Sequence, residues 1–256
     1  MIMFKDIYIF LFTTLFWTTL RLVVGKLIKG KTDRDKDIKI RIVSIFHGLF
    51  GAIYPALSIL RSDYNQCGSS SANDRFIMAM SIGYFFYDTV ACYDANMMDT
   101  NLVIHHGSII IGQYVAFVSK FGIKVAVMGL MLGDCSHPAM QIRGLLRQYH
   151  LKHTQLYNMI DIVYLLQYIV SRGIFGLFNI YHGLFCDNVP LLIRLTCLLI
   201  YAQSYMFIYR MFTILRIKAA EHEERRAKNI RLFWFSENPE VKTLDYAKRP
   251  KHVNVF

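Results

Sequence analysis

Residues 102–119 read LVIHHGSIIIGQYVAFVS, an apolar run of 18 residues that carries two adjacent histidines near its start. A helix of about 18 to 20 apolar residues crosses the hydrocarbon core of a bilayer, which is ~30 Å thick. Six further runs of similar character surround this one, so that the predicted spans are about 7–28, 41–60, 76–93, 102–119, 122–142, 159–182 and 189–214. The sequence therefore predicts an all-α integral membrane protein with about seven transmembrane helices.

The overall composition favours the same class of protein. Hydrophobic residues make up 54% of the 256 residues and charged residues only 18%. Soluble domains usually carry about a quarter charged residues. The composition thus argues against a soluble enzyme and against a disordered protein.

The weakest predicted span is 122–142, because only residues 122–133 are cleanly apolar. To cross the bilayer it must continue through Asp134, His137 and Pro138. We therefore expect this polar stretch to face protein or water instead of lipid.

The basic residues are distributed unevenly between the two sides of the predicted helices. Of the 29 Lys and Arg residues, 20 lie on one side, all in residues 25–41, 143–158 and 216–256, and five lie on the other. The remaining four lie within the spans and are Arg21, Arg172, Arg194 and Arg210. Because basic loops stay on the cytosolic side, the C-terminus is predicted to face the cytosol, or the matrix of a mitochondrion. The net charge of +11 is then a topology signal, and no nucleic-acid partner is expected.

The five cysteines show neither a Cys-x-x-Cys motif nor the spacing of a metal site. Cys67 and Cys186 fall in loops on the same, weakly basic side. A disulfide between them is one alternative, but we expect free thiols.

Ionisable residues inside the predicted spans are the first candidates for a functional site, because such groups usually face a bundle interior or a cavity. Counting 1.5 Å of helix rise per residue places several of them at a similar depth, near the basic side of the membrane. Tyr84 joins them because it is four residues before Asp88 and shares its helical face. The predicted cavity residues are His47, Tyr84, Asp88, His105, His106, Asp134 and His137. The alternative is that these groups hydrogen-bond between helices and hold the bundle together.

Four short segments carry a resemblance to a known family. They are Ser44-Ile45-Phe46-His47, Ser81-Ile82-Gly83-Tyr84-Phe85-Phe86-Tyr87-Asp88, Ile104-His105-His106 and Asp134-Cys135-Ser136-His137-Pro138, the last followed by Gln141-Ile142-Arg143. In order and spacing they resemble the TLC domain, which is shared by ceramide synthases and the translocating-chain-associated membrane protein. The resemblance implies a six-helix barrel, open at one end to an acyl chain. It divides the chain into an extra N-terminal helix with a basic loop (1–37), the TLC-like domain (38–217) and a basic soluble tail (218–256).

The resemblance is closer to the non-synthase branch of the family than to the ceramide synthases. Ceramide synthases carry the His pair and then an acidic array of the form Asp, Asp three residues on and Glu seven residues on. Here those positions read Asp134, His137 and Gln141. We therefore expect a non-catalytic protein that binds or senses a lipid or acyl chain, without a cofactor and as a companion of a larger membrane complex. The alternative is an acyl-CoA-dependent N-acyltransferase, with His105 or His106 as base or acyl acceptor and Asp88 as the residue that orients it.

A metal-dependent hydrolase is a third reading of the same residues, with His47, Asp88, His105 and His106 as ligands. These residue types suit zinc, but no compact spacing such as His-x-x-x-His is present. We therefore expect no metal site.

The segment after the last span predicts partners. Residues 219–230 read as a charged helix that continues from that span, and Leu232 is followed by the aromatic residues Phe233, Trp234 and Phe235. Such a segment is not expected to bury a core of its own. We expect Phe233–Phe235 to dock on another membrane protein subunit, or alternatively to anchor in the membrane interface. The family resemblance implies an endomembrane protein, and the mitochondrial inner membrane is the alternative location.

Overall fold

Local capping signals fix where the helices of the computed structural model begin, within the residues that the structure describes, 4–61 and 64–244. The side chains of Thr32 and Ser71 each accept a hydrogen bond from the backbone N–H three residues on, and the carboxylates of Asp35 and Asp74 each accept one from the backbone N–H of the cap. Such reciprocal caps satisfy backbone N–H groups that the first turn leaves without partners. The elements are α1 (Phe4–Leu27), α2 (Asp33–Leu60), α3 (Ala72–Asp94), α4 (Thr100–Ser119), α5 (Ile123–Asp134), α6 (His137–Gln148), α7 (Gln155–Tyr168), the π-helix η1 (Ile169–Phe175), α8 (Gly176–Phe185), α9 (Leu191–Ala227) and the 3₁₀-helix η2 (Pro239–Thr243).

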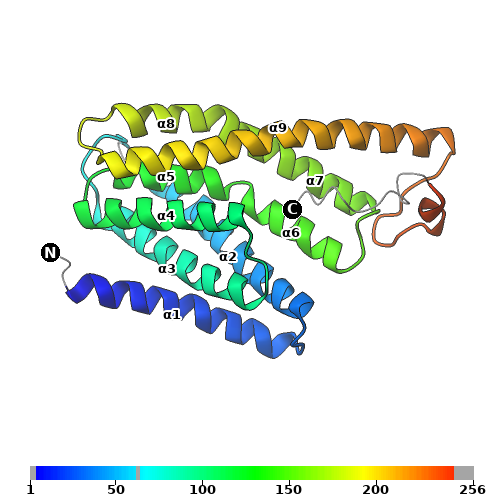
Figure 1. Ribbon diagram of the computed structural model, residues 1–256, viewed down its shortest axis with the longest axis horizontal. Coiled ribbons are helices and arrows are strands. Elements are labelled where there is room, and N and C mark those ends of the chain that lie inside the picture. The colour runs from blue at the N-terminus through cyan, green and yellow to red at the C-terminus, as the bar shows by residue number, and fades with distance from the viewer. Residues whose placement is uncertain (1–3, 62–63, 245–256) are drawn as a thin grey trace.

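The helices run back and forth along one common direction (Figure 1). Residues 64–71 and the connections 120–122 and 186–190 gather at one end, which we call the disulfide end. The connections 28–32 and 149–154 lie toward the opposite end, which we call the tail end because α9 leads there to residues 228–244. The described residues contain no β-strand, so the all-α prediction is confirmed.

Helices α2 to α9 surround the interior, and α1 packs outside them, mainly against α3 (Figure 1). The indole Nε1 of Trp17 donates a hydrogen bond to the backbone oxygen of Met80, at 2.9 Å. This bond satisfies the one polar atom of a side chain that is otherwise buried.

Six helical segments are long and apolar enough to cross a bilayer: Ile7–Leu27, Asp33–Leu60, Ala72–Asp94, Thr100–Ser119, Gln155–Phe185 and Leu191–Ala227. The remaining predicted span, 122–142, is divided between α5 and α6, which have 12 residues each. Each is too short to cross alone, although α6 continues in the direction of α5 (Figure 1). The count of seven single spanning helices is therefore not confirmed.

Proline explains the break between α5 and α6. Pro138 lies in the first turn of α6 and has no N–H to donate to the carbonyl of Asp134, which a continuous helix would require. Helix α2 approaches closely at this point, because a Cβ on Gly51 would overlap the carboxylate of Asp134 and one on Gly48 would lie 3.0 Å from the ring of Pro138. The two glycines thus let α2 pack against the break.

The C-terminal part of the chain differs from expectation. Helix α9 continues beyond the last predicted span, as expected, but it ends at Ala227 and not at residue 230. The next residues fold back on the α6–α7 connection, where the backbone oxygen of Phe233 accepts a hydrogen bond from the Gln155 amide at 2.8 Å. Val241 and Leu244 are fully buried against Ile230 and Leu232. The expectation that this segment buries no core of its own is therefore wrong; residues 245–256 of the predicted tail, like residues 1–3, lie outside the described part of the chain.

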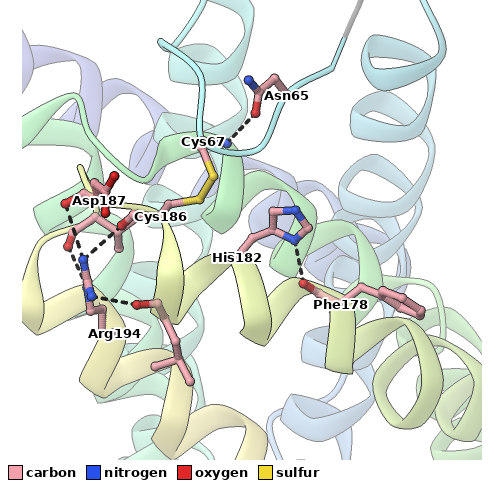
Figure 2. The surroundings of a disulfide bond; sticks show 9 residues. Asn65, Cys67, Phe178, His182, Cys186, Asp187 and Arg194 are labelled. Carbon is pink, nitrogen blue, oxygen red and sulfur yellow. Dashed lines mark hydrogen bonds between the residues drawn. A yellow bond between two sulfur atoms is a disulfide. The ribbon is translucent and has the colours of Figure 1, made fainter.

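The expectation of free thiols at Cys67 and Cys186 is also wrong, because the two form a disulfide with Cα atoms 5.4 Å apart (Figure 2). The loop after α2 folds over the α8–α9 connection, which brings together two residues separated by 119 positions. Arg194 holds that connection by donating to the backbone oxygens of Leu184 and Cys186, at 2.6 and 3.0 Å. Sequence spacing carries no information about this loop closure.

Candidate functional site

The helix barrel encloses a cavity of about 460 Å³, a volume typical of small-molecule and lipid-sized sites. Its wall comes from every helix from α2 to α9 and, among the described residues, from none in α1. Toward the disulfide end the wall includes the apolar residues Val125, Ala126, Ile193 and Cys197. The polar residues of this end form hydrogen bonds within the barrel; they are Gln113, Asn179 and Thr196. Toward the tail end it includes Arg41, Asn101, Arg143 and Arg210. The cavity is therefore amphipathic along its length.

The His pair lies in the second turn of α4, whose start is fixed by the Asp99 side chain accepting from the Leu102 amide at 2.8 Å. His105 and His106 both line the cavity. Nδ1 of His106 lies 3.0 Å from the Thr89 hydroxyl, and Nε2 lies 3.4 Å from Oδ2 of Asp88. The second distance is longer than an ordinary hydrogen bond. Asp88 is thus beside the imidazole, while the hydroxyl of Thr89 lies on the opposite side of the ring.

His47 is fully buried but lies behind the cavity wall. Its ring stacks on Tyr84 with centroids 3.6 Å apart and an angle of 10° between the planes. Trp17 meets both rings edge-on, and the Tyr84 hydroxyl donates to Oγ of Ser44 at 2.9 Å. Six of the seven predicted cavity residues line the cavity, and His47 supports one of them, Tyr84, from behind.

Asp134 and His137 flank the break between α5 and α6, and both line the cavity. Oδ2 of Asp134 lies 3.5 Å from Nδ1 of His47, and Nε2 of His137 lies 3.2 Å from the amide nitrogen of Gln141. The amide oxygen of Gln141 accepts from Nη1 of Arg41 at 3.1 Å. The amide of Gln141 therefore joins a histidine to an arginine.

Arginines of the cavity wall were not predicted as site residues. Arg41 pairs with Asp37 at 3.0 Å, and Arg143 pairs with the buried Asp161 at 3.3 Å. Arg172 lies in the π-helix η1, a type of irregular turn that is frequent at functional sites. The signal in the sequence that points to Arg172 is its charge inside a predicted span, since such groups usually face a bundle interior or a cavity.

The described residues contain no group of three or more His, Cys, Asp or Glu side chains arranged to hold a metal ion. Asp88, His105 and His106 all line the cavity and form a polar layer in its wall. Such a layer can hydrogen-bond the polar group of an amphiphile or transfer a proton to it.

The aromatic residues predicted to dock a partner lie outside the barrel, at the tail end. The side chains of Phe233, Trp234 and Phe235 are 49%, 52% and 75% exposed. The backbone of Phe233 is nevertheless held by Gln155. The fold thus presents the three rings on an ordered segment.

A family model described as TLC domain matches residues 37–217. The match covers α2 from Asp37, α3 to α8 and α9 as far as Ile217, which are the elements that build the cavity wall.

Proposed function

This chain belongs to the TLC-domain family, and on that premise we propose that its barrel binds or senses a lipid or acyl chain without catalysing a reaction on it. The observation that supports the proposal is the cavity of about 460 Å³, whose wall carries apolar side chains such as Val125 and Ile193 toward the disulfide end and arginines such as Arg143 toward the tail end. An acyl chain matches the apolar end because it loses water contact there, at about 25 cal/mol for each Å² of apolar surface. A polar headgroup matches the layer of His105, His106 and Asp88.

The first test fills the apolar end of the cavity. In Ala126→Phe a larger ring occupies the space of the chain, and the purified protein should lose the lipid that copurifies with the wild type, measured by mass spectrometry of the extract. Val118→Phe is the matched control, since Val118 is exposed on the outer face of α4 and does not line the cavity. Equal lipid content in the two variants, with both folded as judged by thermal unfolding, would contradict the proposal.

We place the chain in the non-synthase branch of the family. Gln141 lies where the synthase array carries Glu, and its amide oxygen is engaged by Arg41. We therefore expect no N-acylation when the purified protein is given acyl-CoA and a long-chain base. Turnover that disappears in both His105→Ala and His106→Ala would overturn this assignment in favour of an N-acyltransferase.

We further propose that the protein is a companion of a larger membrane assembly, with the C-terminus on the cytosolic or matrix side of an endomembrane or of the mitochondrial inner membrane. The exposed rings of Phe233, Trp234 and Phe235 support this proposal, because aromatic side chains are enriched at protein interfaces. The disulfide between Cys67 and Cys186 fits an oxidising compartment at the other end. Native mass measurement after mild extraction tests it: a lone monomer, unchanged in Phe233→Ser/Trp234→Ser/Phe235→Ser, would contradict it.

A further inference from the structure

Arg172 lines the cavity. It lies 13 residues before the end of α8, which corresponds to about 20 Å from the disulfide end. Its position is therefore well inside the hydrocarbon layer, where a charged side chain is costly and usually marks a functional path or a partner charge.

The guanidinium is held by neutral groups. Nη2 donates to the backbone oxygen of Gly133 at 3.0 Å, and Nη1 lies 3.4 Å from Oγ of Ser204. Cζ lies 4.9 Å from the centre of the Tyr168 ring. Nε is buried and has no hydrogen-bond partner among the described residues. These contacts aim the group but leave part of its donor capacity unused.

The charge of Arg172 also has no direct counter-ion. Among residues 4–61 and 64–244 it forms no ion pair, whereas Arg41 pairs with Asp37 and Arg143 pairs with Asp161. Asp134 is near enough to interact electrostatically with Arg172, but its carboxylate oxygen lies 3.5 Å from His47. A buried cation without a direct counter-ion is expected to be strongly stabilised by an anion that enters the cavity.

We propose that Arg172 binds the acidic group of an anionic lipid, so that its acyl chain runs toward Val125 and Ile193. The inference rests on the proposed lipid-binding function and specifies the chemistry of the ligand. The planar guanidinium fork matches the oxygens of both a carboxylate and a phosphate. A fatty acid and a lysophospholipid are therefore the two sources of the same chemistry, and the apolar end of the cavity receives the chain of either one.

The test measures dissociation constants of three single-chain probes for the delipidated protein in detergent by native mass spectrometry. Oleate supplies a carboxylate, oleoyl lysophosphatidate a phosphate, and oleyl alcohol the same chain without charge. We expect oleate, lysophosphatidate or both to bind at least about tenfold more tightly than the alcohol, which is the ratio that one charged hydrogen bond supplies. The acid that binds identifies the source.

The variants test the residue itself. Arg172→Gln should reduce the preference for the acid to less than about twofold, and Arg172→Lys, which keeps the charge without the fork, should retain part of it. Arg21→Gln is the matched control, because Arg21 is an intramembrane arginine outside the cavity that pairs with Asp94 at 2.9 Å. If Arg172→Gln does not fold, Arg172→Lys is the deciding variant. A reduced preference for the acid then supports the proposal, and an unchanged preference overturns it.

The outcomes separate the two proposals. Equal affinity for the alcohol and both acids, or an unchanged preference in Arg172→Lys and Arg172→Gln, would overturn the role of Arg172 while leaving a lipid cavity. Absence of binding by all three probes, together with equal lipid content in Ala126→Phe and Val118→Phe, would overturn the lipid cavity and the inference with it.

Discussion

Oδ2 of Asp134 lies 3.5 Å from Nδ1 of His47, so that the last residue of α5 meets the middle of α2 where the chain breaks before α6. Neither nitrogen of His47 has a hydrogen-bond partner among the described residues. The two side chains therefore depend on each other and on close packing of the helices around them. Gly51 provides that packing, one turn along α2 from His47.

Gly51→Ala should destabilise the protein. The new Cβ would overlap the Asp134 carboxylate, so either the carboxylate moves from His47 or α2 moves from α5. Overpacking of this kind costs about 1–3 kcal/mol, and the midpoint of thermal unfolding in detergent should fall accordingly. In Gly107→Ala, by contrast, the added Cβ would meet no atom within 4 Å, and replacing a helical glycine should stabilise by about 0.5–1 kcal/mol. Similar midpoints for the two variants would show that α2 does not approach the break closely.

Asp161 should be far more important for stability than Asp94, although each carboxylate pairs with two cations. Asp161 is 2% exposed and lies 3.3 Å from Nε of Arg143 and 2.5 Å from Nζ of Lys218, so it joins α6, α7 and α9. Asp161→Asn leaves both cations without their buried partner and should cost about 3–5 kcal/mol of unfolding free energy.

Asp94 provides the matched comparison because its side chain is 49% exposed and its pairs with Arg21 and Lys36 are 2.9 and 3.1 Å long. Asp94→Asn should cost less than about 1 kcal/mol, since exposed ion pairs contribute little. Denaturant titrations of both variants check the difference. Equal losses of unfolding free energy in the two variants would mean that burial does not determine how much the ion pairs of Asp161 stabilise the protein.

The sequence predicts the helices and the level of the polar groups well, because both depend on local quantities. An apolar run sets the length of a span, and 1.5 Å per residue sets how deep a side chain lies. The same counting places His105, His106 and Asp88 at one level, where the structure brings His106 within 3.4 Å of Asp88.

What the sequence does not predict depends on which helices are neighbours. His47 and Asp134 come from helices far apart in sequence. Only the packing of those helices places His47 behind the cavity wall and Asp134 in contact with both His47 and the cavity. In the sequence Arg172 is one charge within a span. The direction of its side chain depends on the π-helix that surrounds it. The fold of residues 228–244 depends on contacts with the α6–α7 connection, which hydropathy does not encode.

The disulfide between Cys67 and Cys186 should protect the disulfide end of the barrel. It closes a loop of 119 residues, and disulfides that close long loops commonly stabilise by about 2–4 kcal/mol. Reduction, or Cys67→Ser, should therefore lower the midpoint of thermal unfolding.

Thiol labelling of the denatured protein provides the direct measurement. Three cysteines should react before reduction, Cys92, Cys135 and Cys197, and all five afterwards. Cys197→Ser is the matched control for loss of one sulfur, and it should leave the effect of reduction on the midpoint unchanged. Labelling of five thiols without reductant would show that the bond does not form.

Docking of residues 228–237 on the α6–α7 connection should weaken as the pH falls. Burial lowers the pKa of His153. The positive charges of Lys152, Arg225 and Lys218 lower it further, whereas the negative charge of Glu237 raises it. A released tail exposes the imidazole, whose ordinary pKa is about 6.5. The docked state thus binds fewer protons than the released state, so docking is strongest above about pH 6.5 and is lost progressively as the pH falls toward the lowered pKa.

Hydrogen exchange of the Gln155 amide reports this docking, because that amide donates to the backbone oxygen of Phe233. After correction for intrinsic exchange, its protection should decrease between pH 7.5 and 5.5. His153→Gln, which stays neutral throughout, should flatten the pH dependence, whereas His222→Gln should leave it intact because His222 is exposed. Protection that rises on acidification in the wild type would contradict the sign, and would mean that a charged His153 is held by Glu237 more strongly than burial opposes it.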